Sequence, residues 1–562
     1  MGYAHSAEDY ASTAEALLAE MRNNAGDWDW LRRHIMPRTQ AGANHEERQA
    51  SSRKRMHSTA AIKALRVLTG AHIMYITPTG QQWFAIKSGL KGKKKSARHD
   101  EWFAEATETI FGEIGRSNSY TELHECFLDR CLTGTGCLFC EATPAGKLNF
   151  RHIPTGTYGI AEGAEGLVDT LARSFRLSPH QAVQQFGYRK LPERIREAWD
   201  EPKSRYTAKF EFVHLVMPRT RYEFGHDALQ SRRMKWASVY MAWDAEKKVL
   251  KEDGYNEFPY LVTRFLRNGE GPFGYGPGLD VKEEIAATLK LERVMDVLGE
   301  VATFPRILQL ADQVGEVDLR AGGITTVKAA AAELKMPREW ASSGRYDVGK
   351  DRIDEKERKI REAFFVDMLM PLAEIERQMT ATEVNARQGE KILAFSPSFT
   401  LFISDCNVLI HRVFSVLFRL GRFAMDEVPD ELKVPDLGGS ENFEIELPAV
   451  EYLGHISQAI ARAQQSGIEY FMQVALTYTQ ATGDTAMIEY VEPRKFAKFL
   501  YERTGSPTEC RRTEAQLREL DAQKKEAADM QRKLQATQGA RDAAAAQKDL
   551  AAMPPMQGQP SF

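Results

Sequence analysis

The spacing of apolar and polar residues divides the chain into a helical first section, a β-rich middle and a mainly helical remainder. Residues 7–22, 58–74 and 101–118 carry apolar residues three and four positions apart, which predicts amphipathic helices. From about 148 to 267, alternating and apolar runs predict strands, interrupted at 178–200 by two short helices. Because these strands cluster instead of alternating regularly with helices, the pattern predicts a mainly helical α+β fold.

Two long, highly charged helices are predicted in the second half of the chain, at 280–301 and 350–370. Asp280 followed three residues later by Glu283 is typical of a capping box and predicts where the first helix begins. A mixed insert, 304–349, separates the two helices. Both have only a narrow apolar stripe, so the pair makes little sense in a monomer and predicts contacts with further copies.

The last part of the chain combines one strongly apolar segment with a polar end. Residues 399–423 predict a buried helix. Residues 507–552 are rich in alanine, glutamine and alternating charges, and a lone helix this polar would not bury a core. That segment suits either an oligomeric helical barrel or partial disorder, and 553–562 predicts a flexible end.

Composition narrows the function classes. The 562 residues include 75 basic and 78 acidic side chains, a formal net charge of −3. This balance argues against a protein that holds nucleic acid by bulk positive charge, although it suits one that lets nucleic acid pass. Six cysteines in a chain of this length do not make a disulfide scaffold, so a reducing cytoplasm is expected. The N-terminus resembles no signal peptide and no uncharged apolar stretch is long enough to span a bilayer, so no membrane is expected as a partner.

The glycine stretch 269–274 fits the G-x-G-x-x-G spacing of a dinucleotide-binding loop, and a predicted strand and helix flank it. A soluble nucleotide-binding enzyme is therefore the alternative interpretation of the chain. In such an enzyme the helix begins at the third glycine, where its free N–H groups face the pyrophosphate. Here the helix begins later, and two prolines remove N–H donors. The favoured interpretation is a strand-to-helix corner, in which the glycines of the motif, Gly269, Gly271 and Gly274, allow close packing and positive φ.

Four cysteines near His124 have spacings that could suggest a zinc site or a redox pair. Cys126 and Cys131 are about 140° apart around a predicted helix, and Cys137 and Cys140 point to opposite faces of a predicted strand. Four thiolates cannot easily converge from these positions, so buried free thiols are favoured. No metal site, cofactor or catalytic residue is predicted, because no G-x-S-x-G, H-E-x-x-H or carboxylate pair stands in a convincing frame.

Three segments in a fixed order resemble the head-to-tail connector, or portal, proteins of short-tailed bacteriophages. Residues 115–142 resemble the family's helix, small-residue turn and strand. Residues 262–297 resemble its strand, Gly/Tyr corner and entry into the first stem helix, and 379–391, with T-A-T-E-V, resembles the helix after its tunnel loop. The likeness covers roughly residues 10–505.

The resemblance implies a non-enzymatic subunit of a ring, usually of twelve copies, at one vertex of the viral capsid. Double-stranded DNA would pass through its axial channel during packaging and ejection. The implied partners are the terminase motor, which hydrolyses ATP itself, then tail adaptor proteins, together with capsid and scaffolding proteins. The implied location is the virion, with assembly in the host cytoplasm.

The resemblance also implies how the chain is divided. In chain order the parts are a wing (1–278), a first stem helix (279–303), a small α/β clip (304–349), a second stem helix (350–370), a tunnel loop (371–379), the C-terminal part of the wing (380–503), a helical crown or barrel-like extension (504–552) and a flexible tail (553–562).

Candidate site residues follow from these positions. In the tunnel loop, Arg377 is the best candidate for transient phosphate contact, and pairing with Glu374 or Glu376 accounts for it equally well. Charges of both signs would keep the channel wall wet and only weakly attractive to DNA. The candidates that face the channel from the stem are Lys282, Glu283, Lys290, Glu355 and Lys356. The wing–stem corner would be made by Gly274, Gly276 and Gly278.

Overall fold

The computed structural model describes most of residues 6–453 and scattered positions from 470 to 538. Between 6 and 453, gaps longer than three residues lie at 37–57, 90–96, 220–233, 311–317, 328–337, 341–345, 370–395 and 436–442. The chain separates into two units, 1–469 and 470–562, which are described individually. The predicted segments 371–379, 379–391 and 553–562 lie outside the described residues.

Among the described residues, four helices build the first section, and two residues separate the last two of them. They are α1 (Ala7–Ile35), α3 (Ala60–Ile76), α4 (Ala97–Arg116) and α5 (Ser119–Thr133). α1 is longer than predicted, because buried Trp28 and Leu31 continue its apolar stripe beyond residue 22. Its start is fixed by a capping box between Ser6 and Asp9. α5 ends at Gly134, whose φ of +95° suits glycine at a helix C-terminus.

Two antiparallel sheets form the β-rich middle. A three-stranded sheet has the order β3-β2-β9, and a five-stranded sheet has the order β4-β5-β6-β7-β8. Their strands are β2 (Thr135–Ala142), β3 (Leu148–Ile153), β4 (Tyr158–Glu162), β5 (Val168–Leu177), β6 (Phe210–Pro218), β7 (Trp236–Ala242), β8 (Lys248–Tyr255) and β9 (Tyr260–Arg264). The clustering of strands confirms the predicted α+β class.

A small helical insert connects β5 to β6. It contains α6 (Pro179–Phe186), a 3₁₀ turn η1 (Tyr188–Lys190), α7 (Glu193–Asp200) and α8 (Ser204–Thr207). Ser178 and Gln181 form a capping box with proline at the first turn of α6. The predicted pair of short helices at 178–200 is confirmed, and the insert packs its own apolar cluster onto Phe212 of β6.

Strand β2 separates two hydrophobic cores, because successive side chains point to opposite faces. Cys140 lies in the larger core with Cys126 and Cys131, whereas Cys137 lies in the core between α1 and the five-stranded sheet. All four are buried free thiols. Burial raises the pKa of Cys131 and of Cys140 to about 12, so both stay protonated at neutral pH. The buried-thiol interpretation is confirmed, and among the described residues no group of three or more His, Cys, Asp or Glu side chains could hold a metal ion.

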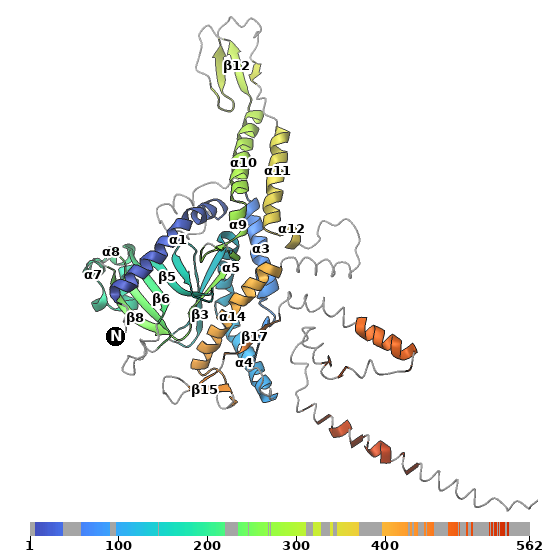
Figure 1. Ribbon diagram of the computed structural model, residues 1–562. Helices are drawn as coiled ribbons and strands as arrows, with labels where there is room; N and C mark the ends of the chain where they lie inside the picture. Colours follow the sequence, from blue (N-terminus) through green and yellow to red (C-terminus); the bar gives the residue numbers. More distant parts are fainter. Residues whose placement is uncertain are drawn as a thin grey trace, which may run out of the picture. The chain divides into compact units, whose positions relative to one another are not determined.

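A two-helix hairpin carries a separate small sheet (Figure 1). The chain passes through β10 (Leu266–Arg267), β11 (Gly274–Tyr275), α9 (Pro277–Asp280) and α10 (Lys282–Thr303). It then forms β12 (Arg306–Leu310), β13 (Ile324–Val327) and β14 (Arg338–Trp340), and continues with α11 (Tyr346–Ala363) and α12 (Val366–Leu369). β12 pairs with β13 in parallel and with β14 antiparallel. α10 and α11 pack side by side.

The predicted limits of both long helices are wrong in detail. Asp280 is not the N-cap of α10: it ends the single turn α9, and Val281 precedes α10 without a side-chain cap. Pro277 starts that earlier turn, because its fixed φ suits the first helical position. α11 runs from Tyr346 to Ala363. It therefore begins four residues before the predicted start at 350 and ends seven residues before the predicted end at 370. Phe365, with a φ of +56°, breaks the helix before α12.

The apolar segment predicted at 399–423 forms α14 (Ser396–Arg419), and much of it is buried. Of the described helices, only this one is apolar and long enough to cross a membrane, over Thr400–Arg419. Its side chains are used in the core, since Phe402 and Ile410 are fully buried there. Arg412 donates to Glu257 at 2.5 Å. The prediction of a buried core helix is confirmed.

Two short strand pairs and the helical positions of the second unit complete the description. β1 (Phe84–Lys87) pairs with β17 (Ala449–Tyr452), and β15 (Lys433–Pro435) pairs with β16 (Phe443–Ile445), both antiparallel. In the second unit, 470–481 is helical, as are the positions described between 516 and 538. The crown assigned to 504–552 stays a prediction.

Buried His214 in β6 predicts a pH-dependent stability. Its ring nitrogens contact the hydroxyls of Tyr260 at 2.8 Å and Ser238 at 2.9 Å. Burial, aided by the charges of Arg173 and Lys251, lowers the pKa of His214 from about 6.5 to about 3. Below pH 6.5 only the unfolded chain takes up this proton, so the free energy of unfolding falls as the pH drops towards 3.

Replacing this histidine, His214→Gln, should therefore flatten the pH dependence. The expected difference in slope is about 1.4 kcal/mol per pH unit between pH 6 and pH 4. Urea unfolding of both proteins at several pH values measures it. A variant with the same slope as the wild type would contradict the neutral, buried state of His214.

Candidate functional site

The glycine corner packs backbone against backbone at the end of α5. A Cβ added to Gly276 would lie 2.6 Å from the amide nitrogen of Gly134, and one on Gly278 would meet the carbonyl oxygen of Leu132. Gly274 contacts Gly134 in the same way. Real Cβ atoms do not approach so closely, so the sequence needs glycine at all three positions. Of the motif glycines, Gly274 shows the expected close packing and Gly269 the expected positive φ, whereas the assignment of Gly274, Gly276 and Gly278 to a wing–stem corner stays a prediction.

The same geometry leaves the nucleotide interpretation without support. Gly269, with a φ of +77°, lies between β10 and β11, and the next glycine of the motif, Gly271, has no heavy atom closer than 4.0 Å to its added Cβ. The N–H of Gly274 donates to Thr135 Oγ1 at 2.8 Å, so it is not available to a phosphate. The stretch forms a strand pair and a single helical turn that packs on α5, which matches no dinucleotide fold.

A buried ion cluster that sequence reasoning missed joins α1, α5 and β3. Arg32 of α1 donates to both carboxylate oxygens of Asp129 of α5, at 2.9 and 3.0 Å, and to the carbonyl oxygen of Thr155. His152 Nε2 is 3.0 Å from Asp129 Oδ2, and the N–H of Thr155 donates to the same oxygen at 2.9 Å. A signal existed in the sequence, because Asp129 and Arg130 interrupt the otherwise apolar run of residues 126–132 in the second half of α5.

Arg130, the next residue of α5, ties this helix to the strand that leads into the corner. Its guanidinium donates to the carbonyl oxygen of Arg264 at 3.1 Å and lies between the rings of Phe265 and Phe402, 5.2 and 5.0 Å from their centroids. His72 Nε2 lies 2.8 Å from Nη1 of the same guanidinium. Charge-assisted hydrogen bonds and cation–π contacts of this kind compensate the burial of a guanidinium. The glycine corner therefore packs against a part of the core in which Arg130 links α5 to the end of β9.

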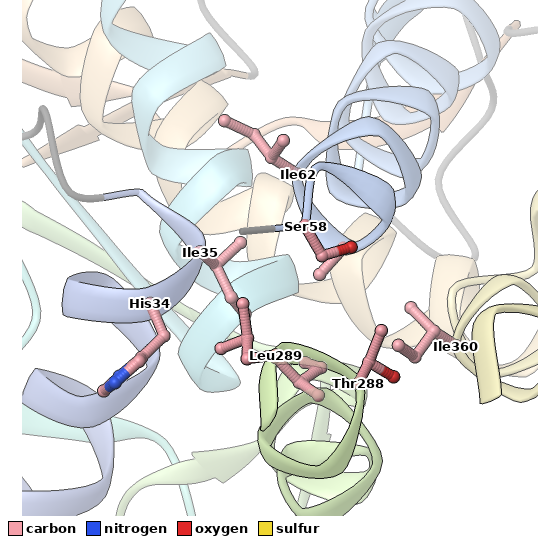
Figure 2. Close-up of a pocket in the computed structure, with 9 residues that line it drawn as sticks. His34, Ile35, Ser58, Ile62, Thr288, Leu289 and Ile360 are labelled. Atoms are coloured by element: carbon pink, nitrogen blue, oxygen red, sulfur yellow. The ribbon is translucent and has the colours of Figure 1, made fainter. Parts of the chain in front are cut away.

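The base of the hairpin is packed where four helices meet. Figure 2 shows a small cavity lined by His34 and Ile35 of α1, Ile62 of α3, Leu289 of α10 and Ile360 of α11. The lining is mainly apolar, and Ile360 is almost fully buried. This cavity is a junction of helices and offers no constellation of polar groups for a ligand.

Two contacts hold α10 and α11 together. Lys356 Nζ is 4.0 Å from Glu284 Oε1. Towards the small sheet, Gly349 of α11 packs directly on Met295 of α10, and an added Cβ would collide with the methionine sulfur. The two helices run antiparallel, since residue numbers rise on one as they fall on the other.

The stem candidates predicted to face a channel are placed in different environments. Lys282 donates to Asp27 of α1 at 2.7 Å and lies 5.7 Å from the ring of Trp30, so it holds the base of α10 to α1. Lys356 pairs with α10 as described above. Three candidates remain exposed: Glu355, which pairs with Lys359 at 3.1 Å, Glu283 and Lys290. The tunnel-loop candidates Glu374, Glu376 and Arg377 lie outside the described residues.

A mainly helical α+β subunit with a charged helical hairpin on a glycine corner is thus the class that fold and site define. The chain belongs to the family of bacteriophage head to tail connecting proteins, whose family model matches residues 7–511. The predicted resemblance is confirmed.

Two curated relatives carry the same assignment. The chain is 26% identical over 393 residues to a "Probable portal protein" of Bordetella phage BPP-1, covering 68% of this chain and 69% of the relative. It is 24% identical over 376 residues to the "Portal protein" of Salmonella phage epsilon15, covering 66% of each chain. The matches span about two thirds of the length of these relatives.

Proposed function

We propose that copies of this chain form a ring at one vertex of a phage capsid, through which double-stranded DNA is packaged and later ejected. Membership of the connecting-protein family supports this proposal. The observation that carries it is the α10–α11 hairpin, because two charged helices that leave most of their surface exposed require neighbours and water on different sides. A ring with one repeated contact between two different faces satisfies both needs.

The proposed parts follow the described elements, with revised helix limits. The wing comprises the two sheets with α1, α3, α4, α5 and α14, and the glycine corner joins it to the stem. The stem is α10 with α11, and the clip is the sheet β13-β12-β14. The described part of the clip consists of strands, whereas α11 already begins at Tyr346, within the 304–349 range predicted for the clip. The tunnel loop at 371–379 and the crown at 504–552 complete the proposal.

Charge composition supports a channel that does not grip DNA. A chain with a formal charge of −3 provides no strong phosphate attraction, and tight contacts would resist translocation. Glu283 and Glu355 are exposed on the proposed stem, so they suit a wet channel wall. Arg377 in the tunnel loop is proposed as the group that contacts phosphates transiently.

The proposed partners are those of a head-to-tail connector. A non-enzymatic ring would present its clip to the terminase motor during packaging and to tail adaptor proteins afterwards. Capsid and scaffolding proteins would surround its wing. The ring would reside in the virion after assembly in the host cytoplasm, and twelve copies are proposed from the family resemblance.

Images of the purified wild-type chain test the proposal most directly. Negative-stain electron microscopy at several protein and salt concentrations should show closed rings with a central hole, and mass photometry should give one dominant oligomer. Particles that remain monomeric under all of these conditions would overturn the proposed function, independently of any variant.

A further inference from the structure

The α10–α11 hairpin has two outward surfaces that differ in chemistry. The α10 outer face consists of Lys290, Arg293, Val294, Val297 and Phe304, with one exposed acidic residue, Glu300, near its end towards the small sheet. Its three apolar residues are 48%, 51% and 63% exposed, in that order. Valine and phenylalanine side chains left this open along one helix indicate a surface that another protein covers.

The α11 outer face is acidic and consists of Val348, Asp351, Asp354 and Glu355. All four side chains are exposed, Val348 to 43%. Within the described part of the chain, neither of the two aspartates forms an ion pair, and the same holds for both cations of the α10 outer face. One face therefore offers unpaired positive charge beside apolar residues, and the other offers unpaired negative charge.

The two faces point away from each other. By the 100° step of an α-helix, Lys290 and Val297 lie about 120–160° around α10 from Glu284 and Met295, which contact α11. Asp351 lies about 140–160° around α11 from Gly349 and Lys356, which contact α10. Opposite sides of one hairpin carrying complementary charge are what a head-to-tail contact between identical subunits needs.

The two faces also lie at the same level of the hairpin. Gly349 packs directly on Met295, so these two residues lie at one level. Lys290 and Arg293 lie five and two residues from Met295 towards the base of α10, and Asp354 and Asp351 lie five and two residues from Gly349 in the same direction on α11. A closed ring is generated by rotation without translation along its axis. Such a rotation brings equal levels of neighbouring hairpins together and thus sets cations opposite aspartates.

We propose that the α10 outer face of one copy binds the α11 outer face of the next copy, with Lys290 and Arg293 paired to Asp351 and Asp354. The valines are covered in the same contact. This inference rests on the proposed ring and names the surfaces that close it. It also assigns Lys290 and Glu355 to the subunit interface instead of the channel wall.

Charge reversal and exchange test this pairing. The variant Lys290→Glu/Arg293→Glu and the variant Asp351→Lys/Asp354→Lys each place like charges across the contact. Each should raise the protein concentration for half-maximal ring formation by about tenfold or more, measured by mass photometry. The fourfold variant restores opposite charges in every contact, so it should return to within about threefold of the wild type. Ring formation by the wild type should weaken at high salt, because the pairs are screened.

A matched control separates this effect from a change in net charge. The variant Arg189→Glu/Lys203→Glu alters two exposed cations of the helical insert and should assemble like the wild type. Far-UV circular dichroism should be unchanged in all variants, because the altered side chains are exposed. Reversed variants that assemble normally, or a fourfold variant that fails to recover, would overturn the interface while wild-type rings still uphold the proposed function. A wild type that forms no rings would overturn both.

Discussion

Replacing Gly276 by alanine should destabilise the protein by about 3 kcal/mol, the upper part of the range for overpacked sites. The backbone angles of Gly276, φ −124° and ψ 162°, are ordinary for alanine, so only the added methyl group matters. That methyl group would lie 2.6 Å from the amide nitrogen and 2.8 Å from the Cα of Gly134. Gly134 cannot yield easily, because its N–H donates to Arg130 O at 3.0 Å and its carbonyl accepts from Phe265 N–H at 2.9 Å.

The expected loss can be measured as the free energy of unfolding in urea, with Gly271→Ala as the matched control. An added Cβ at Gly271 has nothing closer than Glu20 Oε1 at 4.0 Å, so this variant should stay within about 0.5 kcal/mol of the wild type. Equal stability of Gly276→Ala and the wild type would refute the corner as described.

The elements with regular patterns and clear end signals could be predicted from the sequence. The predicted helix that carries Cys126 and Cys131 and the predicted strand that carries Cys137 and Cys140 correspond to α5 and β2, because Gly134 and Gly136 mark the turn between them. The helical insert was recognisable because Ser178 and Pro179 start a helix in a standard way. Such signals depend only on residues that are close in the sequence, so they predict the ends of elements without knowledge of the tertiary structure.

Helix ends that depend on tertiary contacts could not be predicted. Asp280 and Glu283 have the spacing of a capping box, yet the packing of Gly276 and Gly278 on α5 starts the helical turn earlier. The end of α11 is set by Phe364, which is fully buried and precedes the left-handed Phe365. The predicted end at 370 relied on Pro371, which lies eight residues after the observed end of α11 at Ala363.

The environment of the candidate charges could not be predicted for the same reason. Lys282 looked like a free stem cation, but its partner Asp27 is 255 positions away in the sequence. Arg32 and Asp129 are 97 positions apart. Local charge patterns predict only pairs on one helix, such as Glu355 with Lys359. Pairs between elements become visible only once the fold has brought them together.

Removing the buried carboxylate, Asp129→Ala, should destabilise the fold by about 3–5 kcal/mol, the usual cost of leaving a buried charge unpaired. The side chains of Arg32 and Asp129 are both 5% exposed, so water cannot replace the lost partner. Burial by itself would raise the pKa of Asp129, but the charges of Arg32 and His152 and the N–H of Thr155 hold it below its usual range. The carboxylate is therefore ionised throughout the ordinary pH range.

A double-mutant cycle with Arg32→Met identifies the cause of this loss. Arg32→Met removes the charge that Asp129→Ala leaves uncompensated, so the double variant should be more stable than the sum of the single losses predicts, by at least about 1 kcal/mol. Glu15→Ala, which breaks the exposed pair with Lys247, serves as the control and should have far less effect. Strictly additive losses in urea unfolding would show that the two residues are not coupled.

The same pair predicts how acid affects the protein. Because the pKa of Asp129 is lowered in the folded state, its contribution to stability is complete above the unfolded value of about 4. The contribution is lost as the pH falls through the folded value, when the protonated carboxyl no longer compensates Arg32. Between pH 4 and pH 2 the wild type should therefore lose stability more steeply than the Arg32→Met/Asp129→Ala variant. Equal slopes over this interval would mean that Asp129 titrates normally in the folded protein.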